Sequence, residues 1–413
     1  MTRVLFLGDV AQSGFGTVTL DLGKRLLGLG LDVRFISQND SGEPIPEPLG
    51  SRTWPVQVMH PALAIVNGFK DGWKPDACIL VGDYFLTRAV VGGSEQVAAA
   101  FASIPTLHYC PIEGTGLPPG WSLMWEIISP VAMSEFGADQ IEGILGRRPP
   151  VVPHGVDTAT FFPISPSRPT IVPEADMRSF KADWAGGDFR VMSKIGAKAF
   201  FGLNPGRIYA LRTDRNMPRK LYQVLFRTMA AAMTEVENLD LLVHCRVTDQ
   251  GGNLMDSASK YPEDLRKRII FTRAHDSWTG MPRSILNLLY NAADLYVSTS
   301  AEGFGLTIAE SLAAGTPAVA LDYSAVSEVV GDAGILIPPH HLIDNEYDHQ
   351  WATPDEPAFT AAVVRLATKP AERRSFGEAG PRRIGAMYSW DAAARQFAAL
   401  VEEAIQKGAD GGT

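Results

Sequence analysis

The chain has 413 residues, of which 46% are hydrophobic and 20% are charged, with 37 Lys and Arg against 46 Asp and Glu. This composition excludes a wholly disordered chain, and at roughly 100–200 residues per domain the length suits two or three domains. The formal net charge of −9 argues against a protein built mainly to grip a phosphate backbone.

The cysteines and the hydropathy pattern exclude further classes of protein. Cys78, Cys110 and Cys245 are scattered and form no Cys-x-x-Cys pair, which excludes a disulfide scaffold and a cysteine-built zinc site. No run of about 20 uncharged apolar residues occurs, and Asp9 interrupts the first apolar run, so no signal peptide is readable. We expect a soluble, cytoplasmic protein, with peripheral association at a membrane left open.

The N-terminal half alternates short apolar runs with helical patterns. Arg3–Leu7 predicts a buried strand, followed by a polar, glycine-rich loop from Gly8 to Gly16 and a helix over 17–30. Further predicted elements are the strands Val33–Ser37, Ala77–Val81, Thr106–Tyr109, Val131–Ser134 and Val151–Pro153, and the helices Ser94–Ala102 and Glu135–Leu145. Strands separated by helices indicate right-handed βαβ units and a mainly parallel sheet.

A second alternating series follows a break between Phe162 and Asp188, where closely spaced prolines indicate a linker or a surface excursion. Its predicted strands are Arg207–Arg212, Leu239–Cys245, Ile269–Arg273, Asp294–Thr299, Pro317–Leu321 and Gly334–Ile337, with helices at Arg219–Thr234, Ser284–Ala292 and Leu306–Ala314. The tail, 358–406, predicts two or three helices. Two open α/β domains place the expected ligand site beyond the carboxyl ends of the strands, in a cleft between the domains.

The sequence Gly14-Phe15-Gly16 precedes the first predicted helix. A dinucleotide-binding loop needs a third glycine, where this chain has Thr19, and an acidic end to the second strand, where it has Ser37. A nicotinamide or flavin site is therefore disfavoured. Two interpretations stay open: an anion cradle at a helix N-terminus, or a tight strand-to-helix turn.

A basic group follows the strand Arg207–Arg212. It contains Arg215, Arg219 and Lys220, and Pro218 suits the first position of the next helix. Guanidinium and ammonium groups at a helix start suit a diphosphate, because forked hydrogen bonds, a point charge and the helix dipole act together. The alternative is a solvated basic helix start.

Two carboxylates, Glu302 and Glu310, flank the loop after the strand Asp294–Thr299. At about 1.5 Å rise per helical residue they should lie on the order of 10 Å apart. A double-displacement glycosidase pair needs about 5 Å. Two separate ligand contacts fit better, with a helix-face carboxylate as the alternative for Glu310. Its neighbours are apolar, so this carboxylate needs a partner.

These residues carry a resemblance to a known family. The stretch 302–310 is similar to the E-x7-E signature of retaining family 4 glycosyltransferases, which have the GT-B fold, and Arg215 and Lys220 stand where that family carries its diphosphate-binding Arg and Lys. The stretches Met133–Gly137, Pro153–Asp157 and Tyr388–Asp391 also agree. The resemblance touches nearly the whole chain and is strongest in the C-terminal half.

The resemblance implies an α/β, GT-B architecture of two Rossmann-like domains facing a central cleft. The implied domains are an acceptor-binding domain over 1–162, a proline-rich linker or insertion over 163–188, a nucleotide-sugar-binding domain over 189–387, and over 388–413 a helix returning to the N-domain with a tail.

The activity implied is transfer of a sugar from a UDP- or GDP-sugar to a hydroxyl, with retention. Arg215 and Lys220 would neutralise the leaving diphosphate, and Glu310 would hold the ribose. With no nucleophile evident, a front-face mechanism is preferred, without cofactor or metal. The implied catalytic residues are Arg215, Lys220, Glu302 and His108; the implied donor-binding residues are Gly14, Phe15, Gly16, Arg273, Gly303, Phe304, Gly305, Leu306 and Glu310.

Acceptor contacts are predicted at Asp83, just beyond the strand Ala77–Val81, and at Glu113. His154 is predicted to be structural. The acceptor stays open among a glycan, a lipid, a small molecule, a protein and a modified nucleic acid, as does the oligomeric state. The alternatives to a transferase are a non-catalytic nucleotide-sugar binding protein and another GT-B enzyme, such as an epimerase or a phosphorylase.

Overall fold

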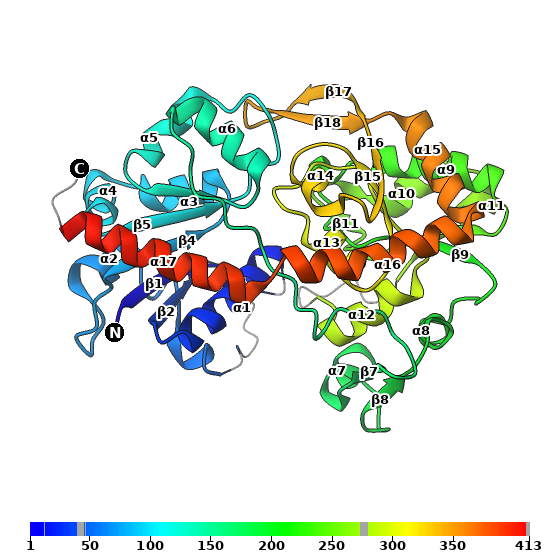
Figure 1. The fold of residues 1–413 in the computed structure, drawn as a ribbon, viewed down its shortest axis with the longest axis horizontal. Coiled ribbons are helices and arrows are strands. Elements are labelled where there is room, and N and C mark those ends of the chain that lie inside the picture. The colour runs from blue at the N-terminus through cyan, green and yellow to red at the C-terminus, as the bar shows by residue number, and fades with distance from the viewer. Residues whose placement is uncertain (12, 39–44, 46, 273–279, 410–413) are drawn as a thin grey trace. The chain divides into compact units, whose positions relative to one another are not determined.

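The computed structural model describes residues 1–11, 13–38, 45, 47–272 and 280–409. The chain divides into two compact units (Figure 1). Unit 1 is formed by Met1–Gly155, Tyr347–His349 and Ser389–Thr413, and unit 2 by Val156–Glu346 and Gln350–Tyr388.

Unit 1 is built on a parallel sheet with the strand order β3-β2-β1-β4-β5-β6. Its strands are β1 (Arg3–Gly8), β2 (Asp32–Ser37), β3 (Thr53–Pro55), β4 (Ala77–Val81), β5 (Thr106–Cys110) and β6 (Ser129–Ala132). The central strands are apolar and buried along most of their length, which explains their unbroken apolar runs. The prediction of a strand at Val151–Pro153 is wrong. This segment forms a single isolated bridge, between Val151 and Ala132.

The helices of unit 1 are α1 (Gly14–Gly28), α2 (Pro61–Asn67), α3 (Tyr84–Val91), α4 (Glu95–Ala102), α5 (Ser122–Trp125), α6 (Glu135–Leu145) and α17 (Trp390–Ala409). The last of these packs against α1, where Arg25 and Asp391 form an ion pair of 2.7 Å (Figure 1). The segment after Tyr388 is therefore part of unit 1.

The start of α1 differs from the prediction. Gly14 and Gly16 were expected in a loop, but they lie in the first turn of α1. The cap is Ser13, whose hydroxyl oxygen accepts from the Gly16 N–H at 3.0 Å. A serine cap followed by small residues lets the helix begin earlier than the apolar spacing indicates.

Unit 2 carries a second parallel sheet, with the order β13-β10-β9-β14-β15-β16. Its strands are β9 (Ile208–Arg212), β10 (Leu239–Val243), β13 (Ile269–Phe271), β14 (Leu295–Ser298), β15 (Ala318–Leu321) and β16 (Gly334–Ile337). In the described residues, three two-stranded antiparallel sheets accompany it: β7 (Thr170–Val172) with β8 (Phe189–Val191), β11 (Thr248–Asp249) with β12 (Gly252–Asn253), and β17 (Pro339–Asp344) with β18 (Gln350–Pro354).

The helices of unit 2 are α7 (Glu174–Phe180), α8 (Lys194–Phe200), α9 (Tyr222–Glu235), α10 (Leu254–Ala258), α11 (Glu263–Arg266), α12 (Arg283–Ala292), α13 (Leu306–Ala313), α14 (Ala325–Val330), α15 (Glu356–Thr368) and α16 (Pro370–Met387). The proline-rich segment 163–188 contains β7 and α7 and belongs to this unit. Its mixed composition hides these short elements from a search for periodicity.

The helix predicted to begin at Pro218 or Arg219 begins later. Pro218–Lys220 form a single 3-10 turn, Leu221 takes a left-handed conformation with φ of 50°, and α9 starts at Tyr222. The basic group after β9 therefore lies in a kinked connection and does not form the first turn of α9.

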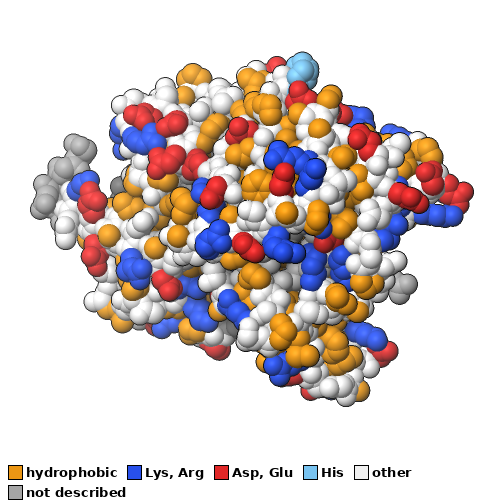
Figure 2. All heavy atoms as spheres, turned by 45° about the vertical axis from the view of Figure 1, so that its right-hand side comes forward, with side chains coloured by type: hydrophobic (Ala, Val, Ile, Leu, Met, Phe, Trp, Pro, Cys, Tyr) orange, Lys and Arg blue, Asp and Glu red, His pale blue; other side chains and the backbone are white. Residues whose placement is uncertain are grey.

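Two surface properties bear on function. In the described part of the chain, no helix has the length and apolar character needed to cross a membrane. Figure 2 shows Lys, Arg, Asp and Glu side chains interspersed over the face it presents, without a broad field of one sign.

Candidate active site

The connection after β9 holds a buried lysine between two carboxylates. Lys220 is 5% exposed, and its Nζ donates to Asp214 Oδ1 at 2.9 Å and to Glu302 Oε1 at 2.5 Å. The left-handed Leu221 ends the 3-10 turn directly after Lys220. Among the described residues, two of the three N–H groups of this ammonium are thus engaged.

Glu302 lies in the loop between β14 and α13 and joins four neighbours. Its carboxylate accepts from Lys220, from the Ser300 hydroxyl at 2.9 Å and from Arg219 Nη1 at 3.3 Å. Its backbone N–H donates to Ser324 Oγ at 2.9 Å. The carboxylate is therefore fixed from the side chain and the backbone at once.

A second ion pair, between Arg212 and Asp214, adjoins Lys220. Arg212, fully buried at the end of β9, has its Nε 2.8 Å from Asp214 Oδ2 and donates through Nη2 to Ser300 Oγ at 2.7 Å. Burial alone would raise the pKa of Asp214, but the charges of Arg212 and Lys220 hold that pKa well below its ordinary value. Asp214 thus stays ionised.

Cations and carboxylates alternate in this cluster. Arg212, Arg219 and Lys220 are paired with the carboxylates of Asp214 and Glu302. Because most of these groups are buried, their charges act on a ligand more strongly than charges in water do.

Glu310 joins the same region through tyrosines. It is buried in α13, and its Oε2 accepts from the Tyr290 hydroxyl at 2.9 Å. The Tyr290 hydroxyl lies 3.2 Å from Thr213 Oγ1, which lies 3.2 Å from the Tyr296 hydroxyl. The expected partner of this carboxylate is therefore a tyrosine, and the two glutamates are separate contacts within one network.

Arg215 lies apart from this cluster. Its side chain is 49% exposed, and its Nε and Nη2 donate to the two carboxylate oxygens of Asp249 at 2.8 and 3.2 Å. The hydrogen bonds from Arg215 lower the pKa of Asp249. The structure brings Arg219 to Glu302 instead.

The loop residues predicted to bind the donor sugar sit directly before α13. Gly303, Phe304 and Gly305 are buried, Leu306 is half-buried, and Gly305 takes φ of 99°, a conformation that disfavours any side chain. Phe304 packs edge-on against Tyr388 at 5.3 Å between ring centroids. These contacts hold the loop backbone in place.

In unit 1, hydrogen bonds within the fold already engage part of the anion cradle that was predicted at Gly14–Gly16. The Gly16 N–H is bonded to Ser13, and the Ser13 hydroxyl donates to Asp9 Oδ2 at 2.5 Å. A Cβ on Gly16 would come within 1.7 Å of the Ala11 carbonyl oxygen, so the second glycine is required by packing. The tight-turn interpretation therefore explains Gly16 by itself.

His108 is fully buried, with both ring nitrogens engaged. Trp125 Nε1 donates to its Nδ1 at 3.1 Å, and its Nε2 lies 3.1 Å from the Gly82 carbonyl oxygen, which it meets as a donor. Burial lowers the pKa of His108 to about 4, so the ring is neutral at pH 7. The predicted catalytic role of His108 gains no support from this geometry.

The other predicted residues have simple local roles. Asp83 caps α3 by accepting from the Leu86 N–H at 2.8 Å, and Glu113 is half-buried beyond β5. His154 is buried, 2.6 Å from the Tyr109 hydroxyl and stacked on Trp390, as expected of a structural residue. Arg273 lies outside the described residues.

Two members of the buried cluster were missed by sequence reasoning. Arg212 was predicted only as the end of a strand, and Asp214 was not singled out. The available signal was a charged pair, spaced two residues apart, directly after an apolar strand. A charge in that setting is rarely buried without a partner.

The described residues contain no group of three or more His, Cys, Asp or Glu side chains arranged to hold a metal ion. The buried carboxylates of the cluster are already bonded to arginine, lysine or tyrosine.

Comparison with solved structures defines the class of fold. The chain is similar to sucrose-phosphate synthase from Thermosynechococcus elongatus, with 18% identity, a TM-score of 0.67 and coverage of 98% of this chain and 99% of that chain. It is equally similar to HepE from Anabaena, solved in complex with UDP, with 15% identity, a TM-score of 0.67 and coverage of 98% and 100%. With its two Rossmann-like halves, the chain has the predicted GT-B fold.

Sequence comparison finds a matching family for much of the second half of the chain, and curated relatives of the chain. Residues 211–369 match the family Glycosyl transferases group 1, which confirms the resemblance for this stretch. The D-inositol 3-phosphate glycosyltransferase of Segniliparus rotundus is 29% identical over 54% of this chain and 46% of that protein. The MMP alpha-(1->4)-mannosyltransferase of Mycolicibacterium hassiacum is 34% identical over 29% of this chain and 26% of that protein. The chain thus spans about half, or less, of the length of these curated relatives.

Proposed function

We propose that the protein is a retaining glycosyltransferase that moves a sugar from a UDP- or GDP-sugar to a hydroxyl acceptor, without a metal or cofactor. The observation that carries the proposal is the buried ammonium of Lys220, held between Asp214 and Glu302 with one N–H to spare. The match of residues 211–369 to a glycosyltransferase family and the fold shared with a UDP-bound protein support it.

In this proposal the cations of the cluster act on the leaving group. Cleavage of the bond between sugar and diphosphate builds negative charge on the phosphate oxygen, and fixed cations in a water-poor site stabilise that charge without reorganising. Lys220 supplies the third N–H, and Arg219 binds the other carboxylate oxygen of Glu302. Arg215, which is half-exposed and paired with Asp249, would contribute its guanidinium from outside this cluster.

Glu302 and Glu310 have different tasks in the proposal. Glu302 and the backbone of 303–305 would hold hydroxyls of the donor sugar, and Glu310 would hold the ribose. With no nucleophile assigned, the leaving phosphate oxygen would take the acceptor proton on the same face. The acceptor hydroxyl attacks the anomeric carbon as the bond from that carbon to phosphate oxygen breaks.

The decisive experiment is release of nucleoside diphosphate from a panel of UDP- and GDP-sugars, with and without candidate acceptors. Lys220→Ala should lower kcat/KM by about 100-fold to 1,000-fold, since it removes a donor aimed at developing charge. The matched control is Lys267→Ala, because Lys267 is 72% exposed and pairs only across one helical turn with Glu263. Product NMR then reports the anomeric configuration, and a chelator tests the metal independence.

Two results would contradict the proposal. If no UDP- or GDP-sugar raises the melting temperature or releases its diphosphate, the donor class is wrong. If nucleotide sugars bind but no bond is broken with any acceptor, the chain is a nucleotide-sugar binding protein. Inverted products would refute retention alone.

A further inference from the structure

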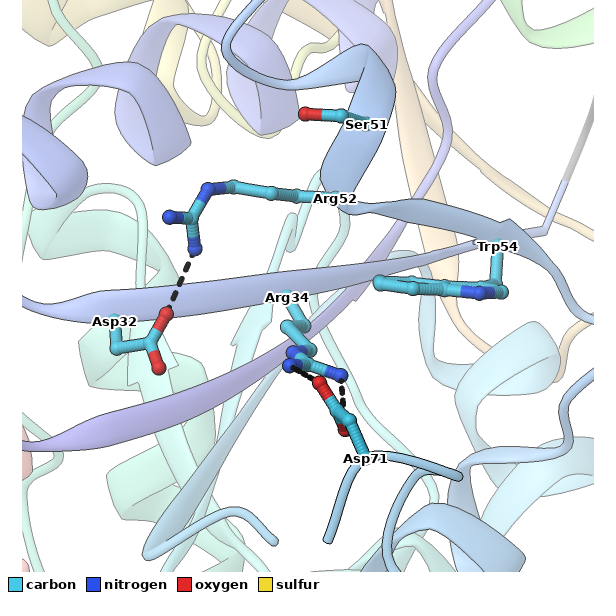
Figure 3. A pocket seen from close by; sticks show the side chains of 6 residues that line it. All are labelled: Asp32, Arg34, Ser51, Arg52, Trp54 and Asp71. Atoms are coloured by element: carbon cyan, nitrogen blue, oxygen red, sulfur yellow. Dashed lines mark hydrogen bonds and ion pairs between the residues drawn. The ribbon is translucent and has the colours of Figure 1, made fainter. Parts of the chain in front are cut away.

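A second candidate site lies at the outer edge of the unit 1 sheet. It is a pocket of about 410 Å³ lined by Asp32, Arg34, Ser51, Arg52, Trp54 and Asp71 (Figure 3). β3 is the edge strand, and Asp32 and Arg34 lie in the first half of β2. The α1 start follows the opposite, carboxyl end of the neighbouring strand β1, so the pocket is separate from the glycines at that helix start.

The strands bring the lining together on one face of the sheet. Side chains two apart on a strand share a face, so Asp32 and Arg34 point to the same side as Ile36. Trp54 is the register partner of Ile36 and shares that face. In Figure 3 the Arg52 side chain reaches across to Asp32, and Asp71 approaches from a separate loop.

The charges of the pocket balance in pairs. Asp71 accepts from both Arg34 Nη atoms at 3.1 and 2.5 Å, and Asp32 accepts from Arg52 Nη1 at 2.7 Å. Each guanidinium is neutralised by its own carboxylate. A phosphate would have to displace a carboxylate, and a cation would have to displace a guanidinium, so neither ion suits the pocket.

Packing and hydrogen bonds also orient two of the lining residues, Arg34 and Asp32. The Arg34 guanidinium lies over the rings of Phe69 and Trp73, 4.8 and 4.7 Å from their centroids. Asp32 accepts a second hydrogen bond, from Trp73 Nε1 at 2.6 Å. Arg34 and Asp32 are thus oriented before any ligand arrives, which lowers the entropic cost of binding.

Fixed donors, fixed acceptors and an aromatic ring suit one ligand chemistry. Hydroxyl groups can donate to carboxylate oxygens and accept from guanidinium N–H groups at the same time. The C–H face of a sugar ring can pack on the indole of Trp54, and the volume lies within the about 300–1,000 Å³ of small-molecule sites. We propose that this pocket binds a neutral saccharide, whether or not the chain transfers sugar from a nucleotide donor.

The test uses the full chain and the neutral disaccharides maltose, cellobiose and mannobiose, with binding followed by saturation-transfer NMR and titration. We expect at least one to bind, and Asp71→Asn to weaken it by about tenfold or more, equivalent to about 1.4 kcal/mol. The matched control is Asp139→Asn, because the two aspartates are alike in exposure and pairing. Asp139 is 62% exposed and salt-bridged to Arg148, and Asp71 is 60% exposed and salt-bridged to Arg34. Trp54→Ala should abolish binding and Trp54→Phe should retain part of it.

Several outcomes would overturn the proposal. One is that none of the three sugars binds at about 20 mM, a concentration that detects even weak, millimolar sites. Another is that binding survives Asp71→Asn but is lost in Lys220→Ala, which would assign it to the donor site. A third is that inorganic phosphate occupies the pocket in preference to the sugars. Donor release is measured separately, so a failed transferase assay leaves this test intact.

Discussion

Replacing Asp214 with asparagine removes the charge that separates two buried cations. Arg212 is 0% exposed and Lys220 is 5% exposed, and their nitrogens lie 2.8 and 2.9 Å from the Asp214 carboxylate. Breaking a buried ion pair from one side costs about 3–5 kcal/mol, because the remaining charge is left uncompensated. We expect Asp214→Asn to lose stability in that range at pH 7, while Asp139→Asn, in an exposed pair, loses little.

The pH dependence of this loss identifies its cause. The pKa of Asp214 in the fold lies below its ordinary 3.8, so the carboxylate contributes stability above about pH 3.8 and loses it as the pH falls further. The gap between wild type and Asp214→Asn should therefore be full at pH 7 and shrink below pH 4 in urea unfolding experiments. A gap that stays constant from pH 7 to pH 3 would refute the electrostatic explanation.

Three further predictions concern packing and protonation. Tyr290→Phe removes the donor to the buried Glu310 and should cost about 1–3 kcal/mol in urea unfolding; an unchanged midpoint would show that other partners suffice. Gly155→Ala would bring a Cβ within 2.0 Å of the Trp390 backbone nitrogen, so a fall in melting temperature is expected, and an unchanged melting curve would contradict the close approach. Because burial lowers the pKa of His108 from 6.5 to about 4, wild-type stability should decline as the pH falls between these values. His108→Gln should flatten that decline, and an equally steep decline in the variant would assign it to other groups.

Much of the fold is predictable from local pattern. Buried parallel strands are nearly continuous apolar runs, so Ala77–Val81 and Gly334–Ile337 have the predicted bounds in the structure. The misplaced starts of α1 and α9 have a different cause. Caps and a left-handed residue at Leu221 set them, and apolar spacing does not record either.

The site was predictable in its residue types and less so in its pairing. Lys220, Glu302 and Glu310 were picked out from position and chemistry, and they share one network. The partners of Lys220 depend on the path of a kinked loop. This path brings the Asp214 carboxylate to 2.9 Å from the Lys220 ammonium and pairs Arg215 with Asp249. No spacing rule in the sequence specifies such a path.

The pairing of buried charges around Lys220 limits which substitutions can be accepted there during evolution. Arg212, Asp214, Lys220 and Glu302 form a chain of alternating sign, in which Asp214 is the carboxylate that pairs with the fully buried Arg212. A neutral residue at position 214 should therefore be accepted only together with a neutral residue at position 212. In an alignment of true relatives, a chain without the aspartate should also lack the arginine.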